Sequence, residues 1–122
     1  MGHRLHVAKT YKVEYAGGSD FNYRVEQFHN LLSELGIDYS GDAYDDDFEV
    51  AVEAWENGIK RLRNLDAETE EVREDIIEAV KALNDPYYPY VTPYDPKSVA
   101  TVMEELLKEA DTDSGYIHLS FF

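Results

Sequence analysis

The sequence predicts an α+β fold: a small sheet that pairs the strands at the N- and C-terminal ends, covered by about four helices. Residues 4–15 and 116–122 alternate apolar and polar side chains, which is the period of a half-buried strand. Between them, apolar residues recur at spacings of three and four, as in amphipathic helices. With 122 residues, 43% of them hydrophobic, the chain predicts one acidic α+β domain over residues 1–122.

The N-terminal part predicts a strand, a turn and a helix. One face of the strand over residues 4–15 would carry Leu5, Val7, Tyr11, Val13 and Tyr15. Lys9 alone breaks this alternation, and Gly17-Gly18-Ser19 marks the turn. Apolar spacing then predicts a helix from about Asn22 to Leu35, which Gly36 would end in a left-handed conformation.

The middle of the chain predicts an acidic loop over residues 38–49 and then a second helix. The apolar stripe of that helix is Phe48, Val52, Trp55, Ile59 and Leu62. Residues 48–50 also fit a short third strand that would precede the helix, and the pattern leaves both interpretations open.

Two more helices and a strand complete the prediction. A third helix covers about residues 67–84, with Asp66 or Thr69 as its cap. Asp95-Pro96 begins the fourth, because Asp caps a helix and Pro fits its first position. That helix runs to about Ala110, and residues 116–122 form the closing strand.

The charge balance bears directly on function. Asp and Glu number 26 against 11 Lys and Arg, a formal net charge of -15. Such a field repels nucleic-acid phosphates and anionic membranes and attracts basic proteins and metal cations. We therefore expect a basic protein partner, with no direct nucleic-acid or membrane binding. Oligomeric state is not predicted.

Other features favour a cytoplasmic protein that is not an enzyme. The N-terminus shows no apolar signal core, and no stretch approaches the ~20 apolar residues of a membrane span. The absence of cysteine excludes disulfides and thiolate chemistry. No serine lies in a nucleophile elbow, and no glycine loop is built to cradle phosphate. No cofactor is predicted, calcium apart.

The 38–49 loop resembles an EF-hand calcium loop. Oxygen ligands would fall at positions 1, 3, 5, 7, 9 and 12, which are Asp38, Ser40, Asp42, the Tyr44 carbonyl, Asp46 and Glu49. Two departures count against it: Ala43 replaces the turn glycine, and Asp45 replaces a hydrophobic residue. A solvated acidic loop is the competing interpretation.

Four histidines give no metal-binding spacing. His6 and His118 would be neighbours on the non-core face if the terminal strands pair, where two imidazoles and a carboxylate suit zinc. We expect them to be surface residues. His29 is expected at the boundary of the first helix's apolar stripe.

Two segments are predicted to bind a partner. The third helix carries a row of acids on its outer face, among them Glu70, Glu71, Glu74 and Glu78, with Arg73 as the early basic residue. The proline-rich segment that follows displays Tyr87, Tyr88, Tyr90 and Tyr94. Tyrosines are enriched at interfaces, although the same residues would also serve as a lid over the core.

The favoured function is a small acidic interaction protein that binds a basic partner. Its sharpest form is a nucleic-acid mimic that blocks a nucleic-acid-binding protein with rows of carboxylates. The alternative is a calcium-binding protein with Asp38, Asp42, Asp46 and Glu49 as ligands. A structural domain of unknown role, or acidity adapted to a high-salt environment, also fits the composition.

Overall fold

The computed structural model describes residues 3–10, 14–41, 45–84 and 93–122. This part of the chain forms an antiparallel sheet of four strands in the order β2-β1-β4-β3, together with four α-helices. The strands are β1 (Leu5–Thr10), β2 (Glu14–Gly17), β3 (Asp47–Ala51) and β4 (Tyr116–Phe121). The helices are α1 (Val25–Glu34), α2 (Val52–Arg63), α3 (Glu70–Lys81) and α4 (Pro96–Glu109).

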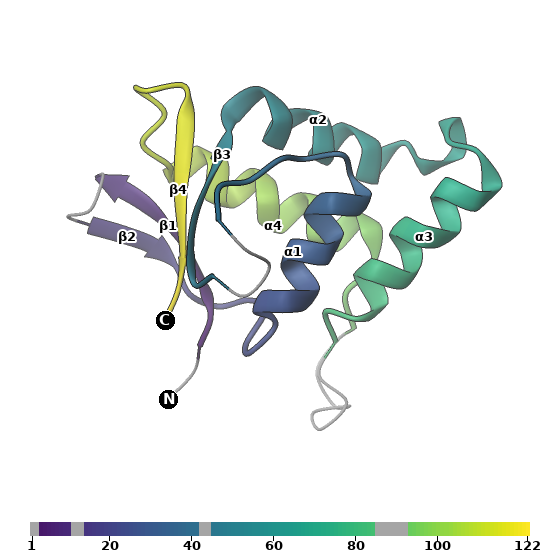
Figure 1. Cartoon of the computed structure of the whole chain (residues 1–122), viewed down its shortest axis with the longest axis horizontal. Helices are drawn as coiled ribbons and strands as arrows, with labels where there is room; N and C mark the ends of the chain where they lie inside the picture. Colours follow the sequence, from purple (N-terminus) through teal and green to yellow (C-terminus); the bar gives the residue numbers. More distant parts are fainter. Residues whose placement is uncertain (1–2, 11–13, 42–44, 85–92) are drawn as a thin grey trace.

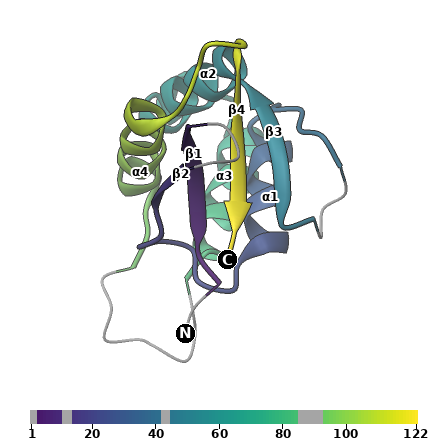
Figure 2. The same ribbon diagram turned by 90° about the vertical axis from the view of Figure 1, so that its left-hand side faces the viewer.

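The helices lie together on one face of the sheet, and none of the described helices lies on the opposite face (Figures 1 and 2). The α3 helix lies at the end of the molecule farthest from the sheet (Figure 1). The predicted α+β class is confirmed, and so is the pairing of the terminal strands. β1 and β4 are antiparallel neighbours, with Leu5 opposite Phe121 and Val7 opposite Leu119.

The core lies between the sheet and the helices. Ile117, Leu119 and Phe121 point into it from β4, as the alternation predicted, and each is at most 2% exposed. Large side chains from the helices and β3 meet them there: Phe28, Leu31, Leu32, Phe48, Trp55, Leu62, Ile76 and Met103. Burial of such side chains stabilises the fold by about 1.5–3 kcal/mol each.

The single strand predicted over residues 4–15 is wrong. The segment contains β1 and β2, which pair antiparallel, while residues 11–13 lie outside the described residues. Tyr15 pairs with Ala8, so it occupies the helix-free face and not the core face predicted for it. Lys9, the residue out of pattern, falls at a register shift of the β-bulge type. Alternation records which face a residue occupies but carries no information on strand direction.

The third strand left open by the sequence is present as β3. It pairs with β4, with Phe48 opposite Leu119 and Val50 opposite Ile117. Phe48 and Val50 are buried, whereas Asp47 is exposed and Glu49 half-buried. The acidic segment therefore ends in an edge strand, and α2 begins only at Val52.

The helix ends follow local signals. α1 ends at Glu34, and Gly36 two residues beyond has a left-handed φ of 72°. The Gly36 and Ile37 amides donate to the Ser33 and Leu32 carbonyls. This pattern is the Schellman motif. α1 begins at Val25, later than predicted, because Phe21 and Tyr23 have positive φ angles of 59° and 58°.

The later helices begin where capping residues predict. Thr69, one of the two predicted caps, accepts from the Val72 amide, so α3 is shorter than the predicted 67–84 span and follows a 3₁₀ turn. Asp95 and Ser98 form a capping box at the start of α4, with Pro96 in the first turn.

Candidate functional site

The α3 helix separates an apolar face from an acidic one. Ile76, Ala79 and Val80 are buried against the rest of the fold. Five carboxylate residues on the other side are exposed: Glu70, Glu71, Glu74, Asp75 and Glu78. We call these five residues the α3 acidic face. With 3.6 residues per turn they fall within an arc of about 140°, so they form one continuous strip.

The spacing of this strip is close to that of a polyanion. The five carboxylates extend over about 12 Å of helix axis, or about one charge every 3 Å. Duplex DNA carries one charge per about 1.7 Å of axis and each of its strands one per about 3.4 Å. The α3 acidic face therefore has an axial charge density between those of one strand and of the duplex.

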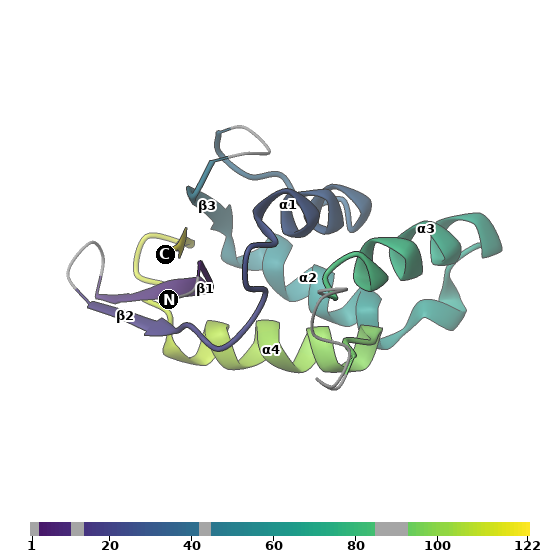
Figure 3. The same ribbon diagram turned by 90° about the horizontal axis from the view of Figure 1, so that it is seen from below.

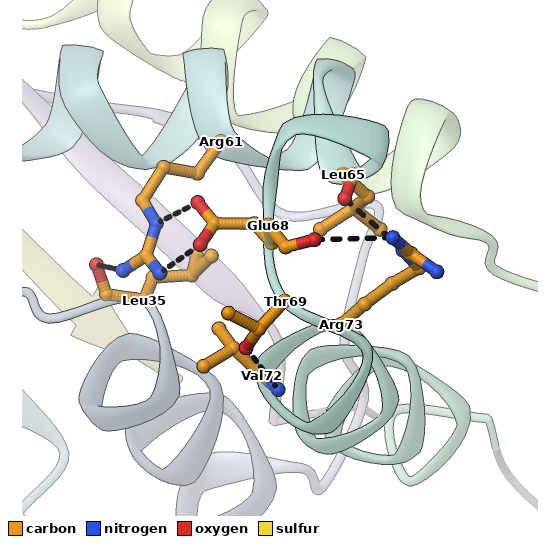
Figure 4. Close-up of polar contacts among 7 residues, drawn as sticks. All are labelled: Leu35, Arg61, Leu65, Glu68, Thr69, Val72 and Arg73. Carbon is orange, nitrogen blue, oxygen red and sulfur yellow. Dashed lines mark hydrogen bonds and ion pairs between the residues drawn. The ribbon is translucent and has the colours of Figure 1, made fainter.

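Arg61 does not neutralise this strip, because its guanidinium is held elsewhere (Figure 4). Its Nε and Nη2 donate to the two carboxylate oxygens of Glu68 at 2.9 and 3.1 Å, and its Nη1 donates to the Leu35 carbonyl at 2.9 Å. Together these bonds join the end of α1, α2 and the residue before the α3 cap. Such a two-pronged pair is stronger and more specific than a single contact.

Arg73, predicted to relieve the acidic row, is also occupied by backbone groups. Its Nε donates to the Leu65 carbonyl and its Nη2 to the Glu68 carbonyl, each at 3.1 Å (Figure 4). The guanidinium thus holds the 3₁₀ turn before α3. In the part of the chain that the structure describes, the α3 acidic face has one ion pair, Lys81 to Glu78 at 3.7 Å.

The Arg61–Glu68 pair makes stability depend on pH. The hydrogen bond from Arg61 lowers the pKa of Glu68 below its ordinary 4.5. A carboxyl whose pKa is lower in the folded state stabilises the fold above its unfolded pKa, and that contribution is lost as pH falls through the folded pKa. Glu68→Gln should therefore lower the melting temperature at pH 7, and the difference from wild type should shrink below about pH 4.5.

Thermal melts from pH 7 to pH 3 would measure this difference. Glu71→Gln is the matched control, because Glu71 is exposed and has no cation within ion-pair distance among the described residues. A Glu68→Gln difference that stays constant down to pH 3 would show that the ion pair does not stabilise the fold.

The structure does not gather the members of the proposed calcium-ligand set that lie among the described residues. Asp38 is exposed beyond α1, the Asp46 carboxylate lies 2.8 Å from His3 Nε2, and Glu49 lies in β3. Asp42 lies outside the described residues. Within the described ranges, no group of three or more His, Asp or Glu residues could hold a metal ion. Calcium binding stays a prediction without support from these positions.

Tyr94 is the member of the predicted tyrosine set that the structure describes; Tyr87, Tyr88 and Tyr90 lie outside the described residues. Its hydroxyl donates to Asp20 Oδ1 at 2.7 Å and accepts from the Phe21 amide at 3.3 Å. Burial, followed by the bond to Asp20, raises the pKa of Tyr94. This tyrosine joins the start of α4 to the segment before α1, and its contact with a partner remains a prediction.

The histidines occupy more internal positions than the sequence indicated. His29, predicted at a boundary, is fully buried, and its Nε2 lies 3.0 Å from the Asp45 carbonyl. His118, predicted on the surface, is 9% exposed and lies beside Asp47 and Glu49 of β3. No sequence pattern indicated these carboxylate neighbours, because β3 was one of two open alternatives.

The α3 acidic face and the 38–49 loop do not form one surface. α1 lies between α3 and the segment leading into β3 (Figures 1 and 3). The described parts of the two acidic segments therefore lie on different sides of α1.

Comparisons with known proteins give no match: no family model, no curated protein and no solved structure is similar to the chain. None of the helices in the described ranges is both long enough and apolar enough to cross a bilayer. Function is therefore inferred from the chemistry of the chain's own residues.

Proposed function

We propose that the protein is a non-enzymatic interaction protein and that its α3 acidic face binds a cationic surface of another protein. The observation that carries this proposal is the use of the neighbouring arginines. Arg61 and Arg73 are held by Glu68 and by backbone carbonyls, so they leave the strip of carboxylates open to a partner.

The energetic cost of the strip supports the same conclusion. Glu70–Glu74 and Glu74–Glu78 are like-charge pairs at i, i+4, each of which destabilises a helix by about 0.2–0.5 kcal/mol. Glu70 and Glu71 are favoured by the helix dipole in the first turn, but Glu78 lies near the C-terminal end, where the dipole disfavours acid. Binding to a cationic partner would offset these costs.

The finer form of the proposal is nucleic-acid mimicry. A charge about every 3 Å along one strip suits the basic cleft of a nucleic-acid-binding protein, because such clefts are built to neutralise phosphates at comparable spacing. In this role the protein would compete with nucleic acid for the cleft. The carboxylates of α3 would take the place of the phosphates.

The test is a charge-matched pair of variants. The first changes Glu70, Glu71, Glu74 and Glu78 to Gln; the second changes the exposed acids Glu53, Glu56, Glu105 and Glu109 of α2 and α4 to Gln. Both lose four negative charges, but only the first alters α3. We expect the affinity for captured basic proteins to fall by about tenfold or more in the first variant and by less in the second. The reason is that electrostatic attraction of a partner depends on the potential at the surface it binds.

Quantitative affinity capture from a host lysate, followed by binding kinetics with each captured protein, would give these values. Association should slow steeply with added salt, since charges are screened beyond about 8 Å at physiological ionic strength. If duplex DNA competes with the protein for binding to a captured partner, that result would support nucleic-acid mimicry. Stability of the α3 variant should stay within about 1 kcal/mol of wild type. Identical partner profiles for wild type and both variants would refute the proposal and leave a merely solvated acidic face.

A further inference from the structure

The helix-free face of the sheet is a second surface that no described helix covers, although Ala8, His118 and Ser120 at its centre are buried by neighbouring side chains (Figure 2). Strand register places its side chains in two rows. In one row Tyr15 pairs with Ala8 and His118 pairs with Glu49; the other row runs Gly17, His6, Ser120, Asp47. Apart from the histidines and the Tyr15 hydroxyl, the ionisable groups in these rows are the carboxylates of Glu49 and Asp47, both on the edge strand β3. Arg4 lies beyond the rows, where its backbone pairs with that of Phe122.

Aromatic side chains gather on this face. Phe122 stacks on His6 with ring centroids 3.7 Å apart and planes within 7°. Tyr15 meets Phe122 edge-on at 5.5 Å and His118 at 6.2 Å. Phe122 and Tyr116 remain 53% and 55% exposed. We call His6, Tyr15, Tyr116, His118 and Phe122 the sheet-face cluster.

Exposed apolar surface that is rimmed by polar residues commonly marks an interaction site. The Phe122 ring is already held by its stack on His6, so a ligand that covers its outer side would not have to order it. Tyr116 is the first residue of β4 and Phe122 follows its last residue, which places one exposed ring on each side of the two rows.

The carboxylates beside the cluster determine the kind of ligand. Asp47 Oδ1 lies 3.6 Å from His118 Nε2, and Glu49 Oε2 lies 3.5 Å from His118 Nδ1. The Asp47 side chain is 67% exposed, so it can accept further hydrogen bonds. A guanidinium stacks on rings through its flat face and donates N–H groups in its plane, so it suits a face that carries both exposed rings and an exposed carboxylate.

Two other occupants fit less well. Aromatic residues on the central strands of an antiparallel sheet also stack nucleic-acid bases, but Asp47, Glu49 and a net charge of -15 repel phosphates. A second copy of the chain would bring the same two carboxylates and the same net charge against this face. Charge complementarity therefore favours a cationic partner.

We propose that the sheet-face cluster binds an arginine-containing segment of another protein. The guanidinium would stack on Phe122 or Tyr116, and its N–H groups would reach Asp47 and Glu49. This site goes beyond the proposed function of α3, because the sheet and α3 lie at opposite ends of the molecule (Figure 1). One partner that spans both surfaces would gain from the two contacts together.

The test uses a synthetic peptide that alternates arginine and serine, with a lysine–serine peptide of equal length and charge for comparison. Fluorescence anisotropy gives the affinity, and amide chemical shifts of the wild type give the location. We expect saturable shifts in β4 and β3 and tighter binding of the arginine peptide. Tyr116→Ala with Phe122→Ala should weaken that binding by roughly tenfold.

Controls separate this site from α3. Tyr23→Ala removes an aromatic ring that is 61% exposed but lies outside the sheet. This change should leave the affinity for the arginine peptide unaltered. In the four-Gln variant of α3, the arginine peptide should still cause the chemical-shift changes in β4. Asp47→Asn should weaken binding without removing any core residue.

Four results would each overturn the proposal: shifts confined to α3, equal affinity for the arginine and lysine peptides, unchanged affinity in the Tyr116/Phe122 variant, or stronger binding of oligothymidylate. Dimerisation that is abolished by Tyr116→Ala with Phe122→Ala would assign the face to a second copy instead. Failure of the sheet-face proposal would leave the α3 proposal standing, because the α3 proposal is tested separately by the two charge-matched variants, each with four Glu→Gln changes.

Discussion

Removal of residues 116–122 is expected to abolish cooperative folding. β4 lies between β1 and β3 and pairs with both, so its loss leaves β1 and β3 without their shared neighbour. It also removes three core side chains, Ile117, Leu119 and Phe121, each worth about 1.5–3 kcal/mol. That loss is comparable with the about 5–15 kcal/mol of total stability that domains possess. Thermal denaturation followed by circular dichroism should show no sigmoidal transition.

The matched control removes Phe122 alone. This residue lies beyond β4 and is 53% exposed, so the shortened chain should melt within a few degrees of wild type. A chain that lacks residues 116–122 and still melts cooperatively at the wild-type temperature would contradict the central place of β4.

Substitution of Trp55 by Ala should destabilise the protein more than any other single change in α2. Trp55 is fully buried, packs against Phe28 with centroids 6.1 Å apart, and donates from its Nε1 to the Met103 carbonyl at 2.8 Å. Truncation of a buried Trp costs about 3–5 kcal/mol, through lost burial and the cavity that remains. We expect the melting temperature to fall by about 10 °C or more.

Two further variants identify the cause of that loss. Trp55→Phe keeps a ring but removes the indole N–H donor, so its cost should be smaller, about 1–3 kcal/mol. Asn57→Ala, an exposed change in the same helix, should be nearly neutral. Urea titration measures all three. A Trp55→Ala protein as stable as the Asn57→Ala protein would show that Trp55 does not anchor the core.

Capping residues in the sequence predicted where some helices begin or end, because a cap acts on backbone groups only a few residues away. The Asp95-Pro96 pair predicted the start of α4 because a cap and a first-turn proline act within four residues. Gly36 predicted the end of α1 for the same reason. The hairpin of β1 and β2 was missed, because alternation is unchanged when a chain reverses.

The candidate site was predictable only in part. Helical spacing predicted that Glu70, Glu71, Glu74 and Glu78 would be exposed. The positions of the arginines were not predictable, because Arg73 bonds to carbonyls of a 3₁₀ turn that carries no recognisable sequence pattern. The sheet-face cluster was missed because Tyr15 joins it only when β2 folds back on β1.

The strand order also bears on how the protein is made. During synthesis β1 and β3 emerge long before β4, yet in the finished sheet they touch it and not each other. Until β4 is available, the apolar sides of both strands lack their final partner, and the pairing of Leu5 with Phe121 must close a loop that spans almost the whole sequence. The nascent chain is therefore exposed to misassociation for most of its synthesis, and its strong negative charge would keep such chains apart in that interval.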